Sequence, residues 1–343
     1  MDSAFIIEKS IFIVVIFAIT MIMAMYSTWA ERKVAAYLQD RVGPNRAGWG
    51  GLLQPLADGM KLFAKEEFEP NTKNRFLFFV GPAIAMSTAL MTSAVIPWGD
   101  KLEIFGRTVI LQATDTDSAL LYIFAVVSLG VYGIMIGGWA SNNKFSLMGA
   151  VRAASQMVSY EVAMGLSIIA LLMMTGTLSL KEISAQQAGM DWNVFYQPVG
   201  FFIFLICAFA ETNRTPFDLA ECESELIGGY HTEYSSMKMG FYLFAEYANM
   251  FISATIISVL YFGGYNYPGM SWAIENWGVN IGNVIGIFAL FVKLCFFIFF
   301  FMWIRWTIPR FRYDQLMNLG WKILIPLSIV NIIITGICIL AFK

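Results

Sequence analysis

The first long apolar stretch, SIFIVVIFAITMIMAMYSTWAERK (Ser10–Lys33), decides the fold class. Between Lys9 and Glu31 it contains no charged residue. Because an α-helix rises about 1.5 Å per residue, residues 10–30 are long enough to cross a hydrocarbon core about 30 Å thick. The stretch ends in charged residues and offers no small-residue cleavage site, so we interpret it as a retained membrane span and not as a signal peptide.

Similar apolar blocks recur along the whole chain. Of the 343 residues, 58% are hydrophobic and 13% are charged, whereas about 25% of the residues in soluble domains are charged. No internal repeat, low-complexity run or linker divides the chain. The sequence therefore predicts an all-α polytopic membrane protein with one membrane-embedded domain over residues 1–343. The eight predicted transmembrane helices lie near residues 10–30, 76–97, 119–139, 158–178, 194–210, 239–262, 283–304 and 322–342.

The distribution of lysine and arginine predicts how these spans are oriented. With eight spans, both termini lie on the same side of the membrane and the connecting segments alternate. Sixteen Lys and Arg residues fall in the segments 31–75, 140–157, 211–238 and 305–322, against five on the other side. Loops that carry an excess of positive charge stay in the cytoplasm. We therefore expect these four segments to be cytoplasmic and both termini to be periplasmic.

The first cytoplasmic segment contains a second kind of predicted helix. Between Gly48 and Glu66, apolar residues recur on one helical face and Gln54, Asp58 and Lys61 lie on the other. The apolar positions are Leu52, Leu53, Leu56, Ala57, Met60, Phe63 and Ala64. This pattern is typical of an amphipathic helix that lies in the membrane interface, here on the cytoplasmic side. A simple surface anchor is the alternative interpretation.

The cysteine and histidine content bears on redox chemistry. The four cysteines are far apart and form no CxxC or Cys/His cluster, and the chain has one histidine. Zinc sites and iron–sulfur clusters need several such ligands at close spacing. We therefore expect no metal, flavin or iron–sulfur cluster to be bound by this chain alone. The net charge of -2 and the absence of a basic tail argue against a nucleic-acid partner.

The stretch AETNRTPFDLAECESELIGGYHTEY (Ala210–Tyr234) is unusually acidic for such a chain. If the part after Pro216 is helical, Asp218, Glu221 and Glu225 lie on one face, about 5–6 Å from their neighbours. Like charges at this distance raise one another's pKa and favour exchangeable protons. The alternative is an acidic face in contact with solvent.

Three ionisable residues fall inside predicted spans. Glu161 and Glu246 lie near the cytoplasmic ends of the fourth and sixth spans, and Lys293 lies near the middle of the seventh. Because a charge at the membrane centre costs at least about 2.5 kcal/mol, such groups usually face a bundle interior and belong to a proton or ion path. A structural pair between Glu246 and Lys293 is the alternative. Whether these two residues contact each other stays open.

Four longer segments carry a resemblance to a known family. They are ERKVAAYLQDRVGPNRAGWGGLLQPLADGMKLFAKE (Glu31–Glu66), SYEVAMG (Ser159–Gly165), ETNRTPFDLAECESELIGGYHTEYSSMKMGFYLFAEYANM (Glu211–Met250) and RWTIPRFRYDQLMNLGWK (Arg305–Lys322). Together they closely resemble the H subunit of bacterial respiratory complex I, the counterpart of mitochondrial NADH dehydrogenase subunit 1. The resemblance extends over essentially the whole chain.

The resemblance implies a role in a proton-translocating NADH:quinone oxidoreductase of the bacterial inner membrane. In this family the subunit forms much of the quinone-access cavity and begins the acidic path that couples quinone reduction to proton pumping. The residues that match the cavity and its opening are Glu31, Arg32, Arg41, Arg46, Asp58 and Arg305. The residues assigned to the coupling path are Glu161, Glu211, Asp218, Glu221, Glu223, Glu225, Glu246 and Lys293. Cys222 departs from the family pattern, where a small residue is usual.

The resemblance also implies what the chain works with. The substrate is a quinone, either ubiquinone or menaquinone, and the enzyme is the whole complex, since this chain has no complete active site. The partners are the peripheral-arm subunits that supply the terminal iron–sulfur cluster and the quinone-head ligands, the small membrane-arm subunits, and the lipid bilayer. One alternative is an ion-translocating membrane subunit of a related membrane-bound hydrogenase complex, and another is a self-sufficient proton channel.

Overall fold

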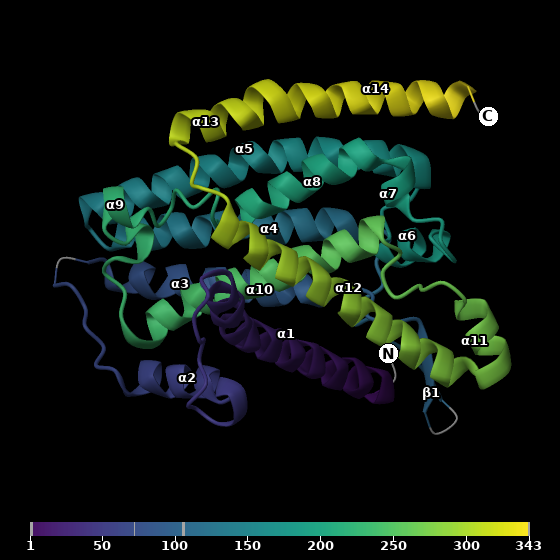
Figure 1. The fold of residues 1–343 in the computed structure, drawn as a ribbon, viewed down its shortest axis with the longest axis horizontal. Coiled ribbons are helices and arrows are strands. Elements are labelled where there is room, and N and C mark those ends of the chain that lie inside the picture. Colours follow the sequence, from purple (N-terminus) through teal and green to yellow (C-terminus); the bar gives the residue numbers. More distant parts are fainter. Residues whose placement is uncertain (1–2, 72, 105–106, 342–343) are drawn as a thin grey trace.

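The computed structural model describes residues 3–71, 73–104 and 107–341 and is almost entirely helical (Figure 1). The longer helices are α1 (Ser3–Leu38), α2 (Gln54–Ala64), α3 (Arg75–Ser93), α4 (Ala119–Ala140), α5 (Lys144–Thr175), α8 (Pro198–Glu211), α10 (Ser236–Tyr261), α12 (Val279–Thr307) and α14 (Ile325–Ala341). Shorter helices are α6 (Leu180–Gln186), α7 (Asn193–Tyr196), α9 (Glu223–Leu226), α11 (Met270–Trp277) and α13 (Tyr313–Asn318). One antiparallel hairpin joins β1 (Lys101–Ile104) to β2 (Arg107–Ile110).

The predicted polytopic membrane architecture is confirmed. Within the described residues, seven helices are long and apolar enough to cross a membrane, and α8 is an additional apolar helix of 14 residues. The block predicted near residues 194–210 thus forms α7 and α8 instead of one continuous span. Pro198 begins α8, because a proline at the first position of a helix lacks only an N–H that would be unpaired there.

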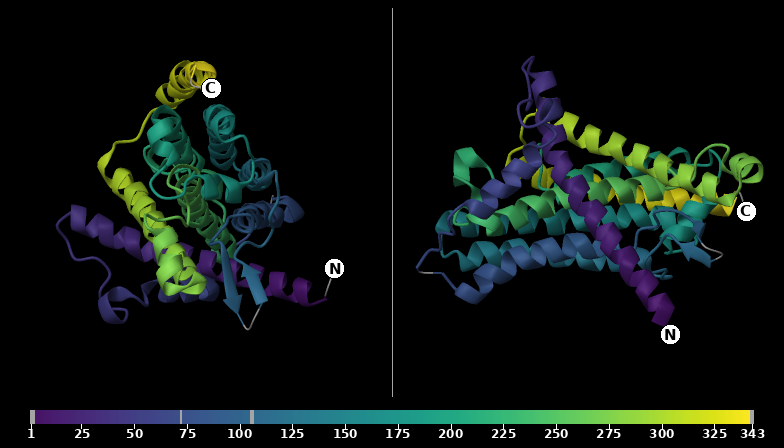
Figure 2. Two further views of the ribbon diagram at one scale, coloured as in Figure 1. Left: turned by 90° about the vertical axis from the view of Figure 1, so that its right-hand side faces the viewer. Right: turned by 90° about the horizontal axis from the view of Figure 1, so that it is seen from below.

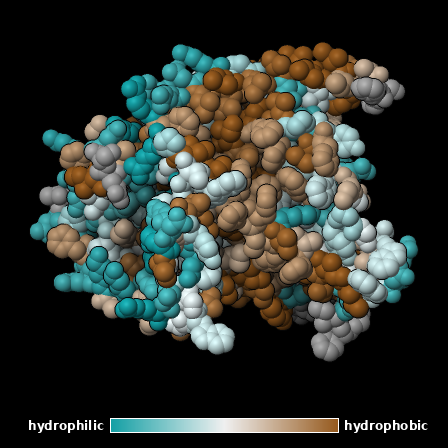
Figure 3. All heavy atoms as spheres, viewed as in Figure 1, coloured by the Kyte–Doolittle hydropathy of each residue, from teal (hydrophilic) through white to brown (hydrophobic). Residues whose placement is uncertain are grey.

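The two ends of the bundle differ in composition. Helix α1 begins and α14 ends at the same end of the molecule, next to β1, α6 and α11, whereas α2, α9 and α13 lie at the opposite end (Figure 1). The four segments that are rich in Lys and Arg therefore share one end, as the charge count predicted. Hydrophilic residues gather there, and hydrophobic residues cover α14 and the middle of the molecule (Figure 3).

Helix α10 lies in the interior of the bundle. In the most hydrophobic part of α10, 67% of the residues are buried. In the corresponding parts of the spans that contain α1 and α14, which lie at the edges of the bundle, 22% are buried (Figure 2). Beside it, α3 and α4 pack closely against each other because they meet at glycines. A Cβ atom at Gly133 of α4 would lie only 2.8 Å from the backbone nitrogen of Ala85 in α3. The hydroxyl of Tyr242, from α10, donates to the carbonyl of Gly133 at 3.1 Å.

The predicted amphipathic helix is present as α2, although it is shorter than the segment from Gly48 to Glu66. Its apolar residues are exposed on the protein: Met60 is 67% and Phe63 is 73% accessible. An amphipathic helix with an uncovered apolar face suits the boundary between lipid headgroups and acyl chains. This helix lies beside the end of α1 and, as described next, forms one wall of a pocket.

Candidate functional site

A pocket of about 230 Å³ lies between α1, α2 and α10. Its walls are mainly apolar and include Met25 from α1, Leu62 from α2, and Leu243 and Phe244 from α10. Tyr247, Arg32 and Asp58 are polar residues of the lining. Binding sites for organic ligands commonly combine apolar walls with a few polar groups in this way.

Next to Tyr247 lies a buried cluster of charged residues. The carboxylate of Glu31 is 2.6 Å from Arg214 through one oxygen and 2.6 Å from Arg305 through the other. Glu31 is 5% and Arg214 is 4% exposed, so the attraction between them is weakly screened by water. The guanidinium carbon of Arg214 lies 4.0 Å from the centre of the Tyr247 ring, which connects the charged cluster to the pocket.

The remaining residues of the predicted cavity lie nearer the surface. Arg32 forms a 2.6 Å ion pair with Asp58, and both line the pocket between α1, α2 and α10. Arg41 and Arg46 are exposed and, together with Arg32, line a second pocket that opens to the surface. The structure therefore brings Glu31, Arg32, Asp58 and Arg305 to one region and places Arg41 and Arg46 at its outer edge.

Asp218, Glu221 and Glu225 would share one helical face only if the part after Pro216 were helical, and it is not. Among residues 212–235, α9 covers only Glu223–Leu226, and the backbone from Thr212 to Cys222 forms turns and irregular structure. Asn213 and Ile227, which lie on either side of these acids, adopt positive φ angles of 49° and 66°, outside the right-handed helical region.

These three acids instead each have their own partner. Asp218 pairs with Arg310 at 2.7 Å, Glu221 lies 3.4 Å from the imidazole of His231, and Glu225 pairs with Arg152 at 2.5 Å. The side chain of Glu223 lies outside the described part of the structure. The acids are thus spread over a folded loop. Arginines from distant parts of the sequence pair with Asp218 and Glu225, whereas the partner of Glu221 is a histidine of the same loop.

Burial raises the pKa of two of these acids. Loss of hydration raises the pKa of Asp218 to about 6, against the opposing attraction of Arg310. Burial, followed by repulsion from Asp218, raises the pKa of Glu221 above its ordinary value. Both carboxyl groups are therefore disposed to bind protons more tightly than exposed carboxyl groups do.

A third, mainly apolar cavity lies deeper, beyond this loop. It has a volume of about 60 Å³ and is lined by Glu211 at the end of α8 and by Glu246 in α10, together with Tyr230 and Tyr242. A cavity needs roughly 10–15 Å³ of such volume for each water molecule, so this one is large enough for water. Oε2 of Glu211 has no hydrogen-bond partner among the described residues, while Tyr230 donates to Glu246 at 3.3 Å.

The other two intramembrane residues are placed separately. Glu161, in α5, accepts a 2.8 Å hydrogen bond from Ser128 of α4. Lys293, in α12, donates to three backbone carbonyls that follow α10, those of Phe262, Gly264 and Asn266, at 2.6–2.8 Å. An ammonium group has three protons to donate. Lys293 therefore does not form the alternative structural pair with Glu246, and it lies apart from the loop acids.

The sequence interpretation missed several residues of this region. Tyr230 and Tyr247 contact Glu246 and Arg214 respectively, and Arg152 neutralises Glu225. A tyrosine directly after Glu246 was a usable signal, since a phenol can donate to a carboxylate or lie against a cation. The described residues contain no group of three or more His, Cys, Asp and Glu side chains that could hold a metal ion.

Comparisons with known proteins agree with this architecture. A family model described as NADH dehydrogenase matches residues 11–336. The H subunit of the NADH-quinone oxidoreductase of Flavobacterium psychrophilum is 84% identical over 343 residues, which are 100% of both chains. An H subunit from Cytophaga hutchinsonii is 66% identical over 340 residues (98% of each chain), and that of Thermomicrobium roseum is 46% identical over 321 residues (91% of this chain and 90% of the other). The chain therefore belongs to the NADH dehydrogenase family, as an H-type membrane subunit of the oxidoreductase complex NADH-quinone oxidoreductase.

Proposed function

We propose that this subunit forms much of the quinone-access cavity of the complex and the acidic path that couples quinone reduction to proton translocation. The observation that carries the proposal is the pocket between α1, α2 and α10, which reaches Tyr247 beside the buried cluster of Glu31, Arg214 and Arg305. An apolar wall suits an isoprenoid tail, and a polar inner end suits a quinone head that becomes charged on reduction.

Reduction of a quinone to a quinol takes up two electrons and two protons, so groups that bind protons near neutral pH are needed close to the cavity. Asp218, with a pKa of about 6, meets this requirement, and the pKa of Glu221 is raised in the same direction. The path continues through Glu246 and Glu211, which line the deeper cavity. We assign Glu161, Glu223 and Glu225 to the same path because they match the acidic residues of the family. Lys293 stabilises the surrounding structure and does not carry protons along the path, because its ammonium protons are already donated to three backbone carbonyl groups.

The quinone is ubiquinone or menaquinone, since apolar walls accept either tail. The electrons come from an iron–sulfur cluster of a partner subunit in the peripheral arm, which docks at the end that carries α2, α9 and α13. Under the charge count, this end faces the cytoplasm of a bacterium, and both termini face the periplasm. The names of the relatives support this interpretation over the hydrogenase alternative, because each of those cited is a subunit of NADH-quinone oxidoreductase.

The test is Asp58→Asn in the assembled complex. Asp58 lines the pocket, and its loss of charge breaks the pair with Arg32 without changing the size of the side chain. We expect quinone reductase activity to fall severalfold, while electron transfer from NADH to a water-soluble acceptor stays normal. Asp314→Asn is the matched control, because Asp314 pairs locally with the exposed Arg312 outside the pocket. Equal loss of both activities in Asp58→Asn would contradict a role in quinone access.

A further inference from the structure

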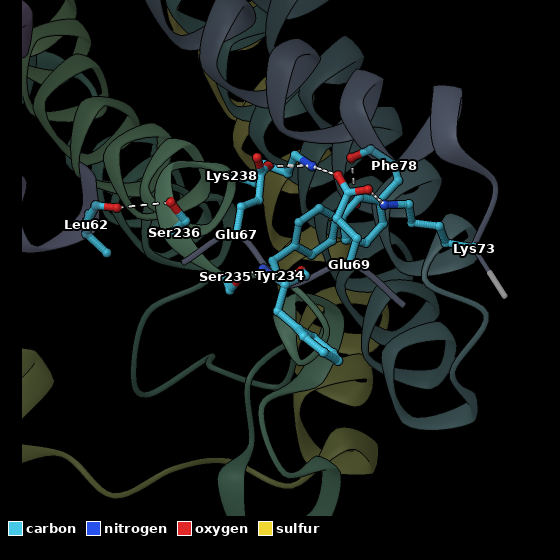
Figure 4. Close-up of polar contacts among 10 residues, drawn as sticks. Leu62, Glu67, Glu69, Lys73, Phe78, Tyr234, Ser235, Ser236 and Lys238 are labelled. Carbon is cyan, nitrogen blue, oxygen red and sulfur yellow. Dashed lines mark hydrogen bonds and ion pairs between the residues drawn. The ribbon is translucent and has the colours of Figure 1, made fainter. Parts of the chain in front are cut away.

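The segment that joins α2 to α3 is tied to the start of α10 by a buried lysine (Figure 4). Nζ of Lys238 lies 2.6 Å from a carboxylate oxygen of Glu67 and also pairs with Glu69. Glu69 in turn pairs with Lys73, just before α3. Hydrogen bonds from Lys238 and then from Lys73 lower the pKa of Glu69 to about 2, so this carboxylate stays ionised at any physiological pH.

Lys238 is held in an environment where an unpaired charge would be costly. Its side chain is 7% exposed, and its ammonium lies 3.5 Å from the centre of the Phe79 ring. A desolvated cation over an aromatic face is attracted to it, but this attraction offsets only part of the loss of hydration. The carboxylates of Glu67 and Glu69 supply the remaining stabilisation. The segment that carries them is therefore drawn onto α10.

Neighbouring residues strengthen this contact. Ser235 exchanges hydrogen bonds with both backbone groups of Phe68, at 2.9 and 3.3 Å. Ser236 donates to the carbonyl of Leu62, in α2, at 3.0 Å. Ser236 has a φ of 55°, which is unfavourable for a residue other than glycine and persists only where its surroundings enforce it. The contact between α2 and α10 is thus fixed at several consecutive positions.

The same contact determines the shape of the pocket. Leu62 and Gly240 both line it, and a Cβ atom at Gly240 would lie 3.3 Å from Cδ1 of Leu62, so the two helices meet closely there. Asp58, one turn earlier in α2, is bound to Arg32 of α1. Helix α2 is therefore attached to α1 by one ion pair, and the segment that follows α2 is attached to α10 by the Lys238 cluster. The pocket lies between these attachments.

We propose that Lys238, acting through Glu67 and Glu69, is a positioning residue that holds α2 at the mouth of the pocket and thereby sets the affinity for a long-tailed quinone. The proposal rests on the quinone-access function proposed above. Lys238 is not among the residues that line the pocket, so it acts through the position of α2.

The test is Lys238→Met in the assembled complex in membranes. Methionine keeps the apolar stem over Phe79 but removes the charge. We expect the KM for a long-tailed quinone to rise at least about threefold with a smaller change in kcat, and the KM for a short-tailed analogue to change less. Hydrogen exchange of residues 54–64 should increase. Lys238→Arg should restore both readouts, because it keeps the charge.

Two further variants make the outcome decisive. Lys181→Met is the control, since Lys181 pairs with Asp115 at 3.6 Å at the opposite end and should leave both readouts unchanged. If Lys238→Met fails to assemble, Glu67→Gln is the substitute. It neutralises one of the two carboxylates that pair with Lys238, at a half-exposed side chain, and should also raise the KM for the long-tailed quinone. Faster exchange without a change in KM overturns the proposal. If Asp58→Asn raises the KM for the long-tailed quinone and Lys238→Met does not, only the positioning role of Lys238 is wrong. If neither variant changes KM, the quinone-access function itself is contradicted.

Discussion

The carboxylate of Glu31 and the guanidinium of Arg214 lie 2.6 Å apart inside the protein, although 183 residues separate them in the sequence. The pair joins α1 to the loop after α8. Arg305 completes the cluster through the other oxygen of Glu31 and extends the connection to α12. Because the pocket reaches Tyr247, which lies against Arg214, we expect a change of charge on Glu31 to affect both the fold and the environment of the pocket.

Replacement of Glu31 by alanine should therefore be strongly destabilising. The change leaves the buried Arg214 without its counter-ion, and breaking a buried pair in this way costs about 3–5 kcal/mol. We expect a lower yield of assembled complex and a lower midpoint of thermal unfolding in detergent. Glu31→Gln, which keeps the shape and a hydrogen-bond acceptor, should assemble better than Glu31→Ala. Equal stability of Glu31→Ala and the wild type would contradict the structural role of the cluster.

Asp218→Asn should change how stability depends on pH. The pKa of Asp218 in the folded protein is about 6, above its ordinary value of 3.8. The stabilising contribution of the protonated group is therefore fully present below about pH 4 and is lost as the pH rises through about 6. Asparagine does not titrate, so the stability of the variant relative to the wild type should improve by roughly 2 kcal/mol between pH 4 and pH 7. Thermal unfolding midpoints across this pH range measure the effect. A difference that does not vary with pH contradicts the raised pKa.

Lys293→Met should affect stability more than proton transport. The change leaves the carbonyls of Phe262, Gly264 and Asn266 without their donor, and each unpaired buried polar group costs about 1–3 kcal/mol. We expect less assembled complex but a normal number of protons translocated per electron in the complex that remains. A normal amount of complex with a lower proton-to-electron ratio would instead return Lys293 to the coupling path.

The sequence predicted the helices better than it predicted the contacts. Hydrophobic blocks such as residues 239–262 follow directly from the need to satisfy backbone groups in lipid, and α10 matches that block closely. The failure at Asp218 and Glu221 has a different origin. Arg310, the partner of Asp218, comes from a distant segment, and His231, the partner of Glu221, is brought close by the irregular fold of the loop. Helical spacing within the loop carries no information about either pair.

The same limit explains why Lys238 was not recognised. Its partner Glu69 lies 169 residues away, and a lysine at the start of a membrane helix is ordinarily a residue of the cytoplasmic interface. Whether Glu246 and Lys293 contact each other also needed the structure, because their predicted depths in the membrane were consistent with a pair. Pairings between distant segments depend on how the helices pack, and the local pattern of the sequence does not specify that packing.

Glu246→Gln tests the coupling role of the acidic path most directly. Glutamine keeps the size of the side chain and can still accept the hydrogen bond from Tyr230, but it removes the titratable proton from the deeper cavity. The measurement is proton translocation together with the quinone reductase rate in membranes, both normalised to the amount of assembled complex. We predict that the two rates fall together, by about tenfold or more, with little loss of assembly. Wild-type values for both would contradict the account and leave Glu246 as a packing residue.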